Sequence, residues 1–586
     1  MRRPSLFAVV CSLVCAASAW ATPFGVRLTH YADPATTMAV SWNSDVPGDN
    51  QVAFGTTPDA LTTTFVVPAV NTSAMPAPLG TSFSARLSGL SPATTYYYRV
   101  GAPGSFYPAP PAAPLSFTTM SDDRCDPVRF VVIGDNRADT STGAPGVSDL
   151  YGGIIGESLA FSPQLFVNTG DMVKNGDVPE EWDAMIRASE PTWSTVPSIT
   201  TQGNHDTGDP DGDGALYNRL YELPQNAETD TEDYYAIDVG PVHFVSLNTQ
   251  HLDASELPAM AGWLDADLAA TAQPWRVVFF HKAVYSRGNH STGEEEDADG
   301  TPGVINRVLT PIFDAHDVDL VLNGHSHNYE RFVPTLGYDA AFGGTGRTFP
   351  AGDKDTIDPA AALPDGTVGT TYVVTGGGGA RTTDIPFYDD LVCIDSACTF
   401  CTGINLGGCD GDVLDLDQDQ ANLVYDGSHH YVAIEIDRGV LTATVQATAT
   451  GNSGAEVIDT FTIAKPSFTS ALCGAEGEGE GEGEGEGEGE GEGEGEGEGE
   501  GEGGEGEGEG EGEPAEGEGE PGEGEGEGDP PAGCTCAGGD ATALPAAGLV
   551  LSAIPLISLI PLISLISLIS RVQRARRRAI KHLATG

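Results

Sequence analysis

Short runs of alternating apolar and polar residues occupy the chain from Thr22 to Met120. Examples are Thr37–Trp42, Val52–Gly55 and Thr94–Val100, and residues that favour turns separate them. Alternation with a period of two turns one face of each strand towards a core, and frequent turns are typical of an antiparallel β-sandwich. The pattern predicts an all-β domain over residues 22–120, in which no cluster of catalytic side chains stands out.

The pattern changes after this region, and a second domain is predicted over residues 126–465. Fully apolar runs that suit buried strands alternate there with runs that suit helices. Such alternation is typical of a layered α/β domain. The clearest strands are Phe130–Ile133, Leu165–Val167 and Leu320–Leu322, and the clearest helices are Ala261–Ala270 and Ile305–Ala315.

Residues 1–21 have the order of a secretory signal peptide. Two arginines precede an apolar run from Leu6 to Ala17, and the small-residue sequence Ala19-Trp20-Ala21 follows. Cleavage after Ala21 is expected. An uncleaved anchor is the alternative, although the apolar run is short for a bilayer. The chain is therefore expected to be exported.

Residues 531–586 contain a second apolar run, Ala546–Ile569, which is long enough to cross a hydrocarbon core of about 30 Å. An arginine-rich segment follows it and should stay in the cytoplasm. This order predicts a transmembrane anchor that leaves the rest of the chain outside. The organisation is also similar to the C-terminal sorting signals of bacterial surface proteins, whose tail is removed after export, so the chain is expected at a bacterial cell surface, anchored or released.

A tract of Gly-Glu dipeptides separates this end from the second domain. It supplies 25 Glu and one Asp, from Glu476 to Asp529, to a formal net charge of −59. Because such a tract buries no apolar surface and repels itself, residues 474–530 are predicted to form a disordered, extended stalk, and weak calcium storage is the alternative. The remaining exported chain is also acidic, which argues against nucleic acid or an anionic lipid surface as its partner.

Six cysteines remain when those of the signal peptide and of the C-terminal segment are set aside. An even number in an oxidising compartment favours up to three disulfides. The alternative is a zinc site in the cluster from Cys393 to Cys409, whose spacing lacks the paired Cys-x-x-Cys form. The six residues are Cys125, Cys393, Cys398, Cys401, Cys409 and Cys473.

Polar side chains that can bind metal follow five of the apolar runs. Because ligand sites of open α/β sheets gather at the carboxyl ends of strands, these segments can converge on one pocket. Carboxylate, amide and imidazole groups suit Zn, Mn or Fe, and six of them are too many for one ion but enough for two. The six residues are Asp135, Asp171, Asn204, His281, His325 and His327.

The order Gly-Asp, Gly-Asp, Gly-Asn-His-Asp, His and Gly-His-x-His within one domain resembles the calcineurin-like metallophosphoesterases. Further phrases resemble the purple acid phosphatase branch, including its fibronectin-III-like N-terminal domain, from about Thr22 to Ala464. The resemblance implies a four-layer domain, in which helices flank two packed sheets, after an all-β sandwich. The phrases are Thr36–Trp42, Phe54–Pro58, Leu90–Gly101, Gly324–Arg331, Val373–Ala380 and Val457–Ile463.

The resemblance also implies roles for single residues. A metal-activated hydroxide would attack phosphorus in line while two ions stabilise the developing charge. His205 would protonate the leaving group as general acid, with Asp206 fixing its orientation. By position, Asp171 would bridge the two metals, Asp135 and His327 would hold the first, and Asn204, His281 and His325 would hold the second.

Two positions depart from the family pattern. Purple acid phosphatases place an iron-ligating Tyr three residues after the bridging Asp, where this chain has Lys174. Other branches place a His two residues after the first Asp, where this chain has Arg137. A coloured tyrosinate–iron site is therefore not expected. Arg137 could hold a substrate phosphate bidentately, and a surface ion pair is its alternative role.

Two Asp-rich segments are candidates for structural calcium. Asp209–Gly214 opens like an EF-hand loop, but Leu220 stands where the final Glu is needed. The segment 410–419 carries five Asp residues. By contrast, His243 lies in an apolar strand and is expected to be structural.

The expected function is hydrolysis of small-molecule phosphomonoesters by an exported dimetal enzyme. A phosphodiesterase or nucleotide hydrolase is one alternative. A surface binding or adhesion protein with an inert phosphoesterase fold is another, although relics lose ligands and all six are present here. Substrate choice is expected to lie in loops 286–303 and 337–366, and the sequence indicates no particular oligomeric state.

Overall fold

The structure is a computed structural model. It describes residues 23–468 except 46–49, 69–70, 139–145, 208–213, 228, 230, 251–255, 287, 289, 291–303, 333, 337–346, 349–355, 358–368, 383–391, 394–399, 402–421, 451–453 and 466–467. These residues belong to one compact unit of the chain, which ends at Glu494.

The N-terminal region is an all-β sandwich, as the alternating pattern predicted. Four of its strands pair in the order β1-β2-β6-β5, and five others form a second sheet in which β3, β8 and β9 all pair with β7. Trp42 stacks on Phe83 and Tyr96 on Phe117 in its core. The strands are β1 (Phe24–Thr29), β2 (Thr37–Ser44), β3 (Gln51–Gly55), β4 (Thr63–Val66), β5 (Thr72–Ala74), β6 (Thr81–Ser88), β7 (Thr95–Ala102), β8 (Ser105–Tyr107) and β9 (Leu115–Thr118).

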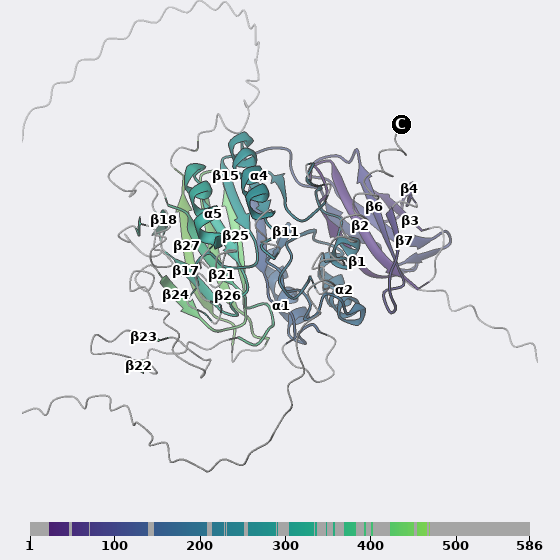
Figure 1. Cartoon of the computed structure of the whole chain (residues 1–586). Helices are drawn as coiled ribbons and strands as arrows, with labels where there is room; N and C mark the ends of the chain where they lie inside the picture. The colour runs from purple at the N-terminus through teal and green to yellow at the C-terminus, as the bar shows by residue number, and fades with distance from the viewer. Residues whose placement is uncertain are drawn as a thin grey trace, which may run out of the picture. The chain divides into compact units, whose positions relative to one another are not determined.

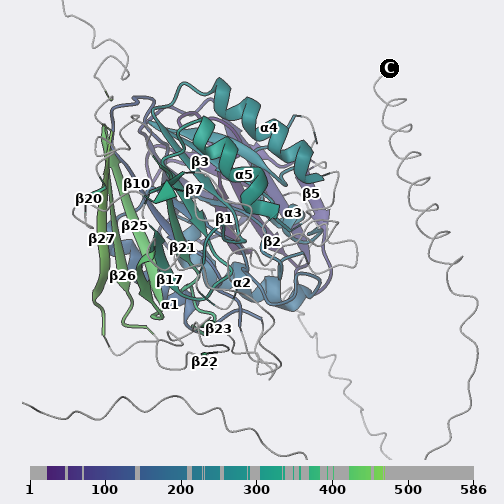
Figure 2. The same ribbon diagram turned by 60° about the vertical axis from the view of Figure 1, so that its left-hand side comes forward.

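The second region contains two mixed sheets (Figures 1 and 2). One continues the sheet of the sandwich through β12-β11-β10-β25-β26-β27, and the other has the order β13-β14-β15-β16-β21-β17-β24. Parallel pairing joins β10, β11 and β12 in the first sheet, and β14, β15, β16 and β21 in the second. The carboxyl ends of these strands therefore lie at one edge of each sheet, where ligand residues were expected.

The elements of this region follow one another as the strand–helix alternation predicted. In chain order they are β10 (Val128–Ile133), α1 (Tyr151–Ser158), η2 (Leu159–Phe161), β11 (Leu165–Asn168), α2 (Pro179–Trp193), β12 (Ser198–Thr200), α3 (Tyr217–Leu220), β13 (Tyr235–Val239), β14 (Val242–Ser246), α4 (Glu256–Ala270), β15 (Trp275–Phe279), α5 (Val304–Ala315), β16 (Leu320–Asn323), β17 (Tyr329–Phe332), β18 (Thr335–Leu336), β19 (Arg347–Thr348), β20 (Thr356–Ile357), β21 (Thr371–Thr375), β22 (Val392–Cys393), β23 (Phe400–Cys401), β24 (Asn422–Asp426), β25 (His430–Asp437), β26 (Val440–Ala447) and β27 (Val457–Ala464).

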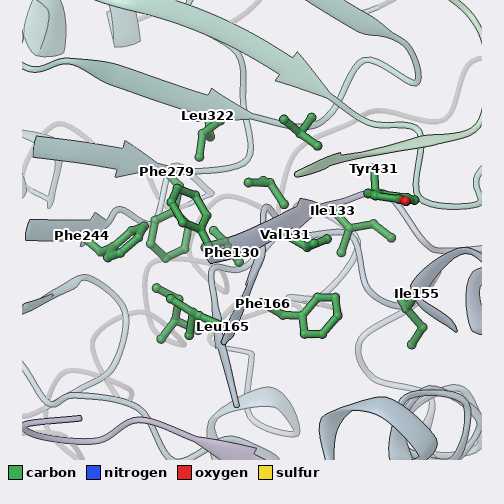
Figure 3. Close-up of a cluster of buried hydrophobic side chains, with 14 of the residues drawn as sticks. Phe130, Val131, Ile133, Ile155, Leu165, Phe166, Phe244, Phe279, Leu322 and Tyr431 are labelled. Carbon is green, nitrogen blue, oxygen red and sulfur yellow. The ribbon is translucent and has the colours of Figure 1, made fainter. Parts of the chain in front are cut away.

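Apolar side chains fill the space between the two sheets (Figure 3). Phe130 of β10 meets Phe244 of β14 edge to face, with ring centroids 5.1 Å apart. The same cluster extends to α1 and α2, where Ile155 and Trp182 are buried. A second cluster lies between the other sheet and the helices α4 and α5, which lie side by side in both views. Two sheets between two pairs of helices make the four layers that the family resemblance implied.

Polar contacts join the N-terminal sandwich to the second region. The buried guanidinium of Arg27 on β1 donates to the carbonyl of Leu220 at 2.7 Å and to Asn43 Oδ1 at 3.0 Å. Glu190 of α2 accepts a hydrogen bond from the amide of Gly25 at 2.7 Å. Strand β1 also pairs in parallel with β12. The sandwich is therefore built onto the second region through its backbone and a buried charge.

Several sequence predictions fall outside the described residues. These are the signal peptide, the Gly-Glu stalk, the apolar run Ala546–Ile569, the calcium candidate 410–419 and most of the candidate Asp209–Gly214. Five of the six cysteines expected to pair also lack a described side chain, so both disulfide pairing and the zinc alternative stay predictions. Within the described residues, no helix combines the length and apolar character needed to cross a membrane.

His243 of β14 is a structural residue, as expected. Its Nδ1 lies 2.7 Å from Asp238 Oδ1 on β13, and its Nε2 lies 2.8 Å from Asp267 Oδ2 on α4. Burial lowers the pKa of His243, but the two carboxylates outweigh burial and raise the pKa to about 9. The charged imidazole thus ties a helix to the sheet beneath it.

Replacing His243 with Gln is expected to destabilise the protein in a pH-dependent way. The folded-state pKa exceeds the unfolded value of about 6.5, so the stabilisation is complete below about pH 6.5 and is lost as the pH rises through about 9. The free energy of unfolding should fall by about 1–3 kcal/mol at pH 6, a range that allows for the half-exposed side chain of Asp238. Urea denaturation at pH 6 and pH 9.5 measures the difference.

The matched control is His316→Gln. His316, directly after α5, pairs at 2.8 Å with Asp265, an exposed residue of α4. This control should change stability little at either pH. An equal loss for His243→Gln at pH 6 and pH 9.5 would contradict the charged-imidazole assignment.

Candidate metal centre

The six predicted ligands follow five strands of the two sheets. Asp135 follows β10, Asp171 follows β11 and Asn204 follows β12, while His281 follows β15, and His325 and His327 follow β16. Backbone hydrogen bonds hold neighbouring loops together, such as Asp135 N to Gly170 O at 2.9 Å and Gly324 N to His281 O at 2.9 Å. The two sheets therefore bring these loops to one place.

Three of the ligand residues have left-handed backbone conformations. The φ angles are +56° at Asp135, +55° at Asp171 and +72° at His325. Non-glycine residues adopt this region at a cost, and such strain gathers at functional sites. The neighbouring glycine at 203 is needed for space, because a Cβ there would overlap the carboxylate and the amide of Asp171. The Gly-Asn-His-Asp sequence thus lets two loops approach closely.

Among the described residues, two groups of side chains could each hold a metal ion. One contains Asp171, His281 and His325, and the other contains Asp135, Asp171 and His327. Within each group the potential ligand atoms all lie within 4.8 Å of one another, and all five residues are buried. Asp171 belongs to both groups, so one carboxylate could supply an oxygen to each site.

The group around His281 has the donor set that a cation requires. His281 Nδ1 donates to the carbonyl of Thr169 at 2.9 Å, so Nε2 is the ring atom that a metal could reach. This Nε2 atom faces Asp171 Oδ1 at 3.3 Å, Asn204 Oδ1 at 3.1 Å and His325 Nδ1 at 3.1 Å. Burial lowers the pKa of His281, but Asp171 and Asp135 outweigh burial and raise it to about 9, so a proton joins these atoms here. A metal ion would replace that proton and could take all four atoms as ligands, so this group fits a metal ion.

The group around Asp135 contains a cation of the protein itself. His327 Nε2 lies 3.6 Å from Asp135 Oδ1, and His327 Nδ1 donates to the carbonyl of Arg381 at 2.9 Å. Arg137 Nε donates to Asp171 Oδ2 at 3.1 Å, and its Nη2 lies 3.2 Å from His327 Nε2. The residues fit a metal, but a guanidinium contacts two of the three ligand side chains.

Burial and charge act in opposite directions on the two carboxylates. Burial is the largest effect on Asp135 and raises its pKa above the ordinary value. Burial alone would also raise the pKa of Asp171, but His281, His205 and Arg137 together hold it below the ordinary value. Asp171 therefore stays ionised, as a carboxylate between two cations must.

His205 lies at the open side of the site. Its backbone amide donates to Asp171 Oδ1 at 3.0 Å, its Nδ1 lies 2.7 Å from the carbonyl of Lys174, and its Nε2 is 4.0 Å from Asp171 Oδ2. Its side chain is 31% exposed, so an incoming molecule can reach it. Because Nδ1 is bound to a carbonyl, Nε2 is the atom available for proton transfer.

The predicted role of Asp206 is to fix the orientation of His205. The Asp206 carboxylate accepts hydrogen bonds from the backbone amides of Met172, Val173 and Gly203, at 2.9, 3.1 and 2.8 Å. Asp206 braces the loop after β11, whose Lys174 carbonyl binds the His205 ring. It acts on His205 through the backbone because its short side chain faces the buried loop.

Two family models match adjacent parts of the chain. Residues 23–119 match the N-terminal domain of purple acid phosphatases, and residues 128–329 match the calcineurin-like phosphoesterases. The chain belongs to the purple acid phosphatase-like metallophosphoesterases. The predicted resemblance is therefore confirmed.

Individual relatives agree with this family. The chain is 26% identical to purple acid phosphatase 23 of Arabidopsis thaliana over 52% of its length and 64% of that protein. It is 27% identical to an uncharacterized protein of Mycobacterium tuberculosis, over 75% and 87% of the two chains. The solved structure of purple acid phosphatase PPD1 from yellow lupin aligns with a TM-score of 0.55 at 19% identity, over 76% and 74% of the two chains.

The chain spans about half to two thirds of the length of the curated plant phosphatases that it matches. Two positions set it apart from the family pattern, as the sequence indicated. Lys174 occupies the place of the tyrosine ligand, and its carbonyl serves His205. Arg137 forms an ion pair that is nearly buried, with 12% of its side chain exposed, so the alternative of a surface ion pair is wrong.

Sequence reasoning missed a further histidine of this metallophosphoesterase. His290 stacks on His325, with ring centroids 3.7 Å apart and planes at 27°. Its carbonyl accepts a hydrogen bond from Ser326 Oγ at 3.0 Å. The signal that could have found it is its place at the start of loop 286–303, the loop singled out for substrate choice.

The phrases that carried the resemblance also contact one another. Arg331, in the Gly-His-x-His phrase, pairs with Asp459, in the closing phrase, at 2.6 Å, and Tyr329 donates to the same carboxylate at 2.7 Å. Buried Glu330 accepts from Ser286 Oγ at 2.8 Å and from the amide of Gly288 at 3.2 Å. These contacts fix β17 and the start of the loop that carries His290.

Proposed function

We propose that this chain hydrolyses small-molecule phosphomonoesters with two metal ions held at the candidate metal centre. The observation that carries the proposal is that both ligand groups contain Asp171, because two neighbouring ions that act on one phosphoryl group need a shared ligand. The family supports the same reaction class. The name of the Arabidopsis relative, an acid phosphatase, supports the choice of monoesters.

Each ligand residue has a proposed place. Asp135 and His327 would hold the first ion, Asn204, His281 and His325 the second, and Asp171 both. Iron, zinc and manganese all suit this set of carboxylate, amide and imidazole groups. When bound, such ions supply Lewis acidity and lower the pKa of water, so that hydroxide is available near neutral pH.

The remaining chemistry belongs to side chains around the ligands. His205 would hold a proton at Nε2 and pass it to the leaving oxygen, because Nδ1 is bound to Lys174. Arg137 would supply a permanent positive charge that binds a phosphoryl oxygen. Asp206 would keep the loop that orients His205 in place.

A substrate panel tests the proposal. The purified chain, loaded with manganese, zinc or iron, should hydrolyse p-nitrophenyl phosphate faster than bis(p-nitrophenyl) phosphate. The reverse order would favour the phosphodiesterase alternative. If the chain hydrolyses neither compound and no nucleotide, whichever of the three metals is added, the enzyme proposal is rejected and the adhesion-protein alternative is favoured.

The iron-loaded protein is expected to be nearly colourless. Tyrosinate bound to ferric iron gives an intense visible charge-transfer band, and the position of that ligand is Lys174 here. The visible absorption spectrum of the iron-loaded protein measures this. A strong band would show that another tyrosine binds the iron. The variant Lys174→Tyr is the matched comparison and should gain colour.

We also propose that the enzyme is exported and held at the outer surface of a membrane. The support is the signal-like order of residues 1–21 and the apolar run Ala546–Ile569 followed by arginines. The composition of residues 474–530 predicts a segment open to protease. Structural calcium and disulfides also remain proposals, because they rest on the Asp-rich segments and the even number of cysteines in the sequence.

Mild proteolysis of intact cells, with any outer membrane opened, is expected to release soluble phosphatase activity of nearly unchanged turnover. A chain that stops before Glu476 should be exported as the same soluble enzyme. The assay is hydrolysis in the supernatant against that in the cell fraction. Activity that stays in the cytoplasm, or a truncated chain that folds but is inactive, would contradict the anchor and stalk.

A further inference from the structure

The two ligand groups differ in their contacts with Arg137. The first group is Asp135, Asp171 and His327, and the second is Asp171, His281 and His325. The first group has three ligand side chains, and Arg137 donates to Asp171 at 3.1 Å and lies 3.2 Å from His327 Nε2. Because His327 donates through Nδ1 to the carbonyl of Arg381, Nε2 carries the only lone pair it could give a metal. The guanidinium thus holds the lone pairs that an ion in this group would need.

The second group has a different composition. Asp171, His281 and His325 are joined by Asn204 Oδ1, which lies 3.1 Å from His281 Nε2. Thr169 fixes His281 so that Nε2 faces these atoms. Four side chains therefore converge here. Arg137 contacts Asp171 through Oδ2, whereas His281 faces Asp171 Oδ1.

Sequence departures weaken the first group further. Its tyrosine ligand is replaced by Lys174, which leaves Asp135, Asp171 and His327. A guanidinium a few ångströms away repels a divalent ion, and in a buried site this repulsion weakens metal binding strongly. An ion in the first group would therefore compete with Arg137 for Asp171 and His327.

We propose that Arg137 makes the first metal site depend on the phosphate group. The second site fills first, and the ion of the first site binds when Arg137 moves from Asp171 and His327 to the oxygens of a phosphate. Phosphate and the first-site ion then strengthen each other's binding, as linkage requires. The inference rests on the proposed function and adds an order of assembly to the same site.

Metal titration of the full chain tests the proposal without any turnover. Manganese is added to metal-free protein, and free and bound ion are counted by electron paramagnetic resonance with and without inorganic phosphate. The wild-type chain should bind one ion at least about tenfold more tightly than the second. Phosphate should tighten the second binding step at least about fivefold and leave the first step nearly unchanged.

Variants assign the two steps. Arg137→Gln should tighten the weak step at least about fivefold in the absence of phosphate and abolish the effect of phosphate. Arg187→Gln, which removes a half-exposed guanidinium on α2, is the control and should behave as the wild type. His327→Ala should remove only the weak step, and His325→Ala should remove the tight one.

Equal affinities in the wild type, or a phosphate effect that persists in Arg137→Gln, would overturn the proposal. Loss of the tight step in His327→Ala would also overturn it. The phosphate effect is measured on the wild-type chain, so the test stands even where a variant folds poorly. Unequal sites in a chain that hydrolyses no phosphoester would instead reject the proposed function and leave the order of assembly intact.

Discussion

Replacing Asp171 with Asn is expected to lower phosphoester hydrolysis by at least about a thousandfold. The carboxylate is buried, ionised and shared by both ligand groups, and no other residue in those groups is shared. The amide keeps the shape but removes the negative charge between two cations. The catalytic constant and the bound metal per chain should therefore fall together, which steady-state kinetics and elemental analysis measure.

Asp183→Asn is the matched control for this change. Asp183 pairs with Arg187 on the surface of α2, so the same substitution there should leave activity and metal content unchanged. Full activity of Asp171→Asn with two bound metals would refute the bridging role. A loss of activity with both metals retained would move Asp171 from metal binding to another catalytic role.

Replacing Asp459 with Ala is expected to lower the free energy of unfolding by about 3–5 kcal/mol. The carboxylate binds Arg331 through two hydrogen bonds, of 2.6 and 3.0 Å, and both side chains are buried. Removing it leaves a guanidinium without its main partner in a region of low dielectric. Urea denaturation of the purified variant measures the change.

Two further variants show whether the buried charge is the cause. Asp183→Ala breaks a surface ion pair and should cost at most about 1 kcal/mol. The double variant Arg331→Met/Asp459→Ala removes both charges and should recover part of the stability lost by Asp459→Ala. A loss for Asp459→Ala no larger than that for Asp183→Ala would contradict the assignment.

The layers and the clustering of ligands could be predicted from sequence because both follow from local patterns. Apolar runs such as Phe130–Ile133 predict buried strands, and the carboxyl ends of parallel strands meet at one edge of a sheet. Asp135 and Asp171 were therefore expected near each other, and the structure has both in one ligand group. Period and order were enough for an all-β domain followed by a layered α/β domain, whereas the four-layer arrangement was implied by the family resemblance.

Contacts between segments far apart in sequence could not be predicted in this way. No local pattern tells that Arg331 meets Asp459, that Arg137 reaches His327, or that His290 stacks on His325. The sequence also contains no sign that the sandwich sheet continues into the second region, because this depends on the pairing of the distant strands β1 and β12. Such contacts depend on how layers pack and on which rotamer each side chain adopts.

The role of Asp206 shows a second limit of sequence reasoning. The sequence predicted that Asp206 fixes the orientation of His205 but not through which contacts, because adjacent residues in a loop point in different directions. Asp206 is fully buried and accepts three backbone hydrogen bonds, whereas the His205 side chain is 31% exposed. Spacing in sequence identified the residues of the site, and only the fold determines which of them touch.

The most direct test of the shared carboxylate is a crystal structure of the chain grown with excess manganese and phosphate. Anomalous scattering should place one ion among Asp171, Asn204, His281 and His325 and another among Asp135, Asp171 and His327. The two oxygens of Asp171 should then contact different ions. A single ion under saturating metal, or two ions of which only one touches Asp171, would contradict the account.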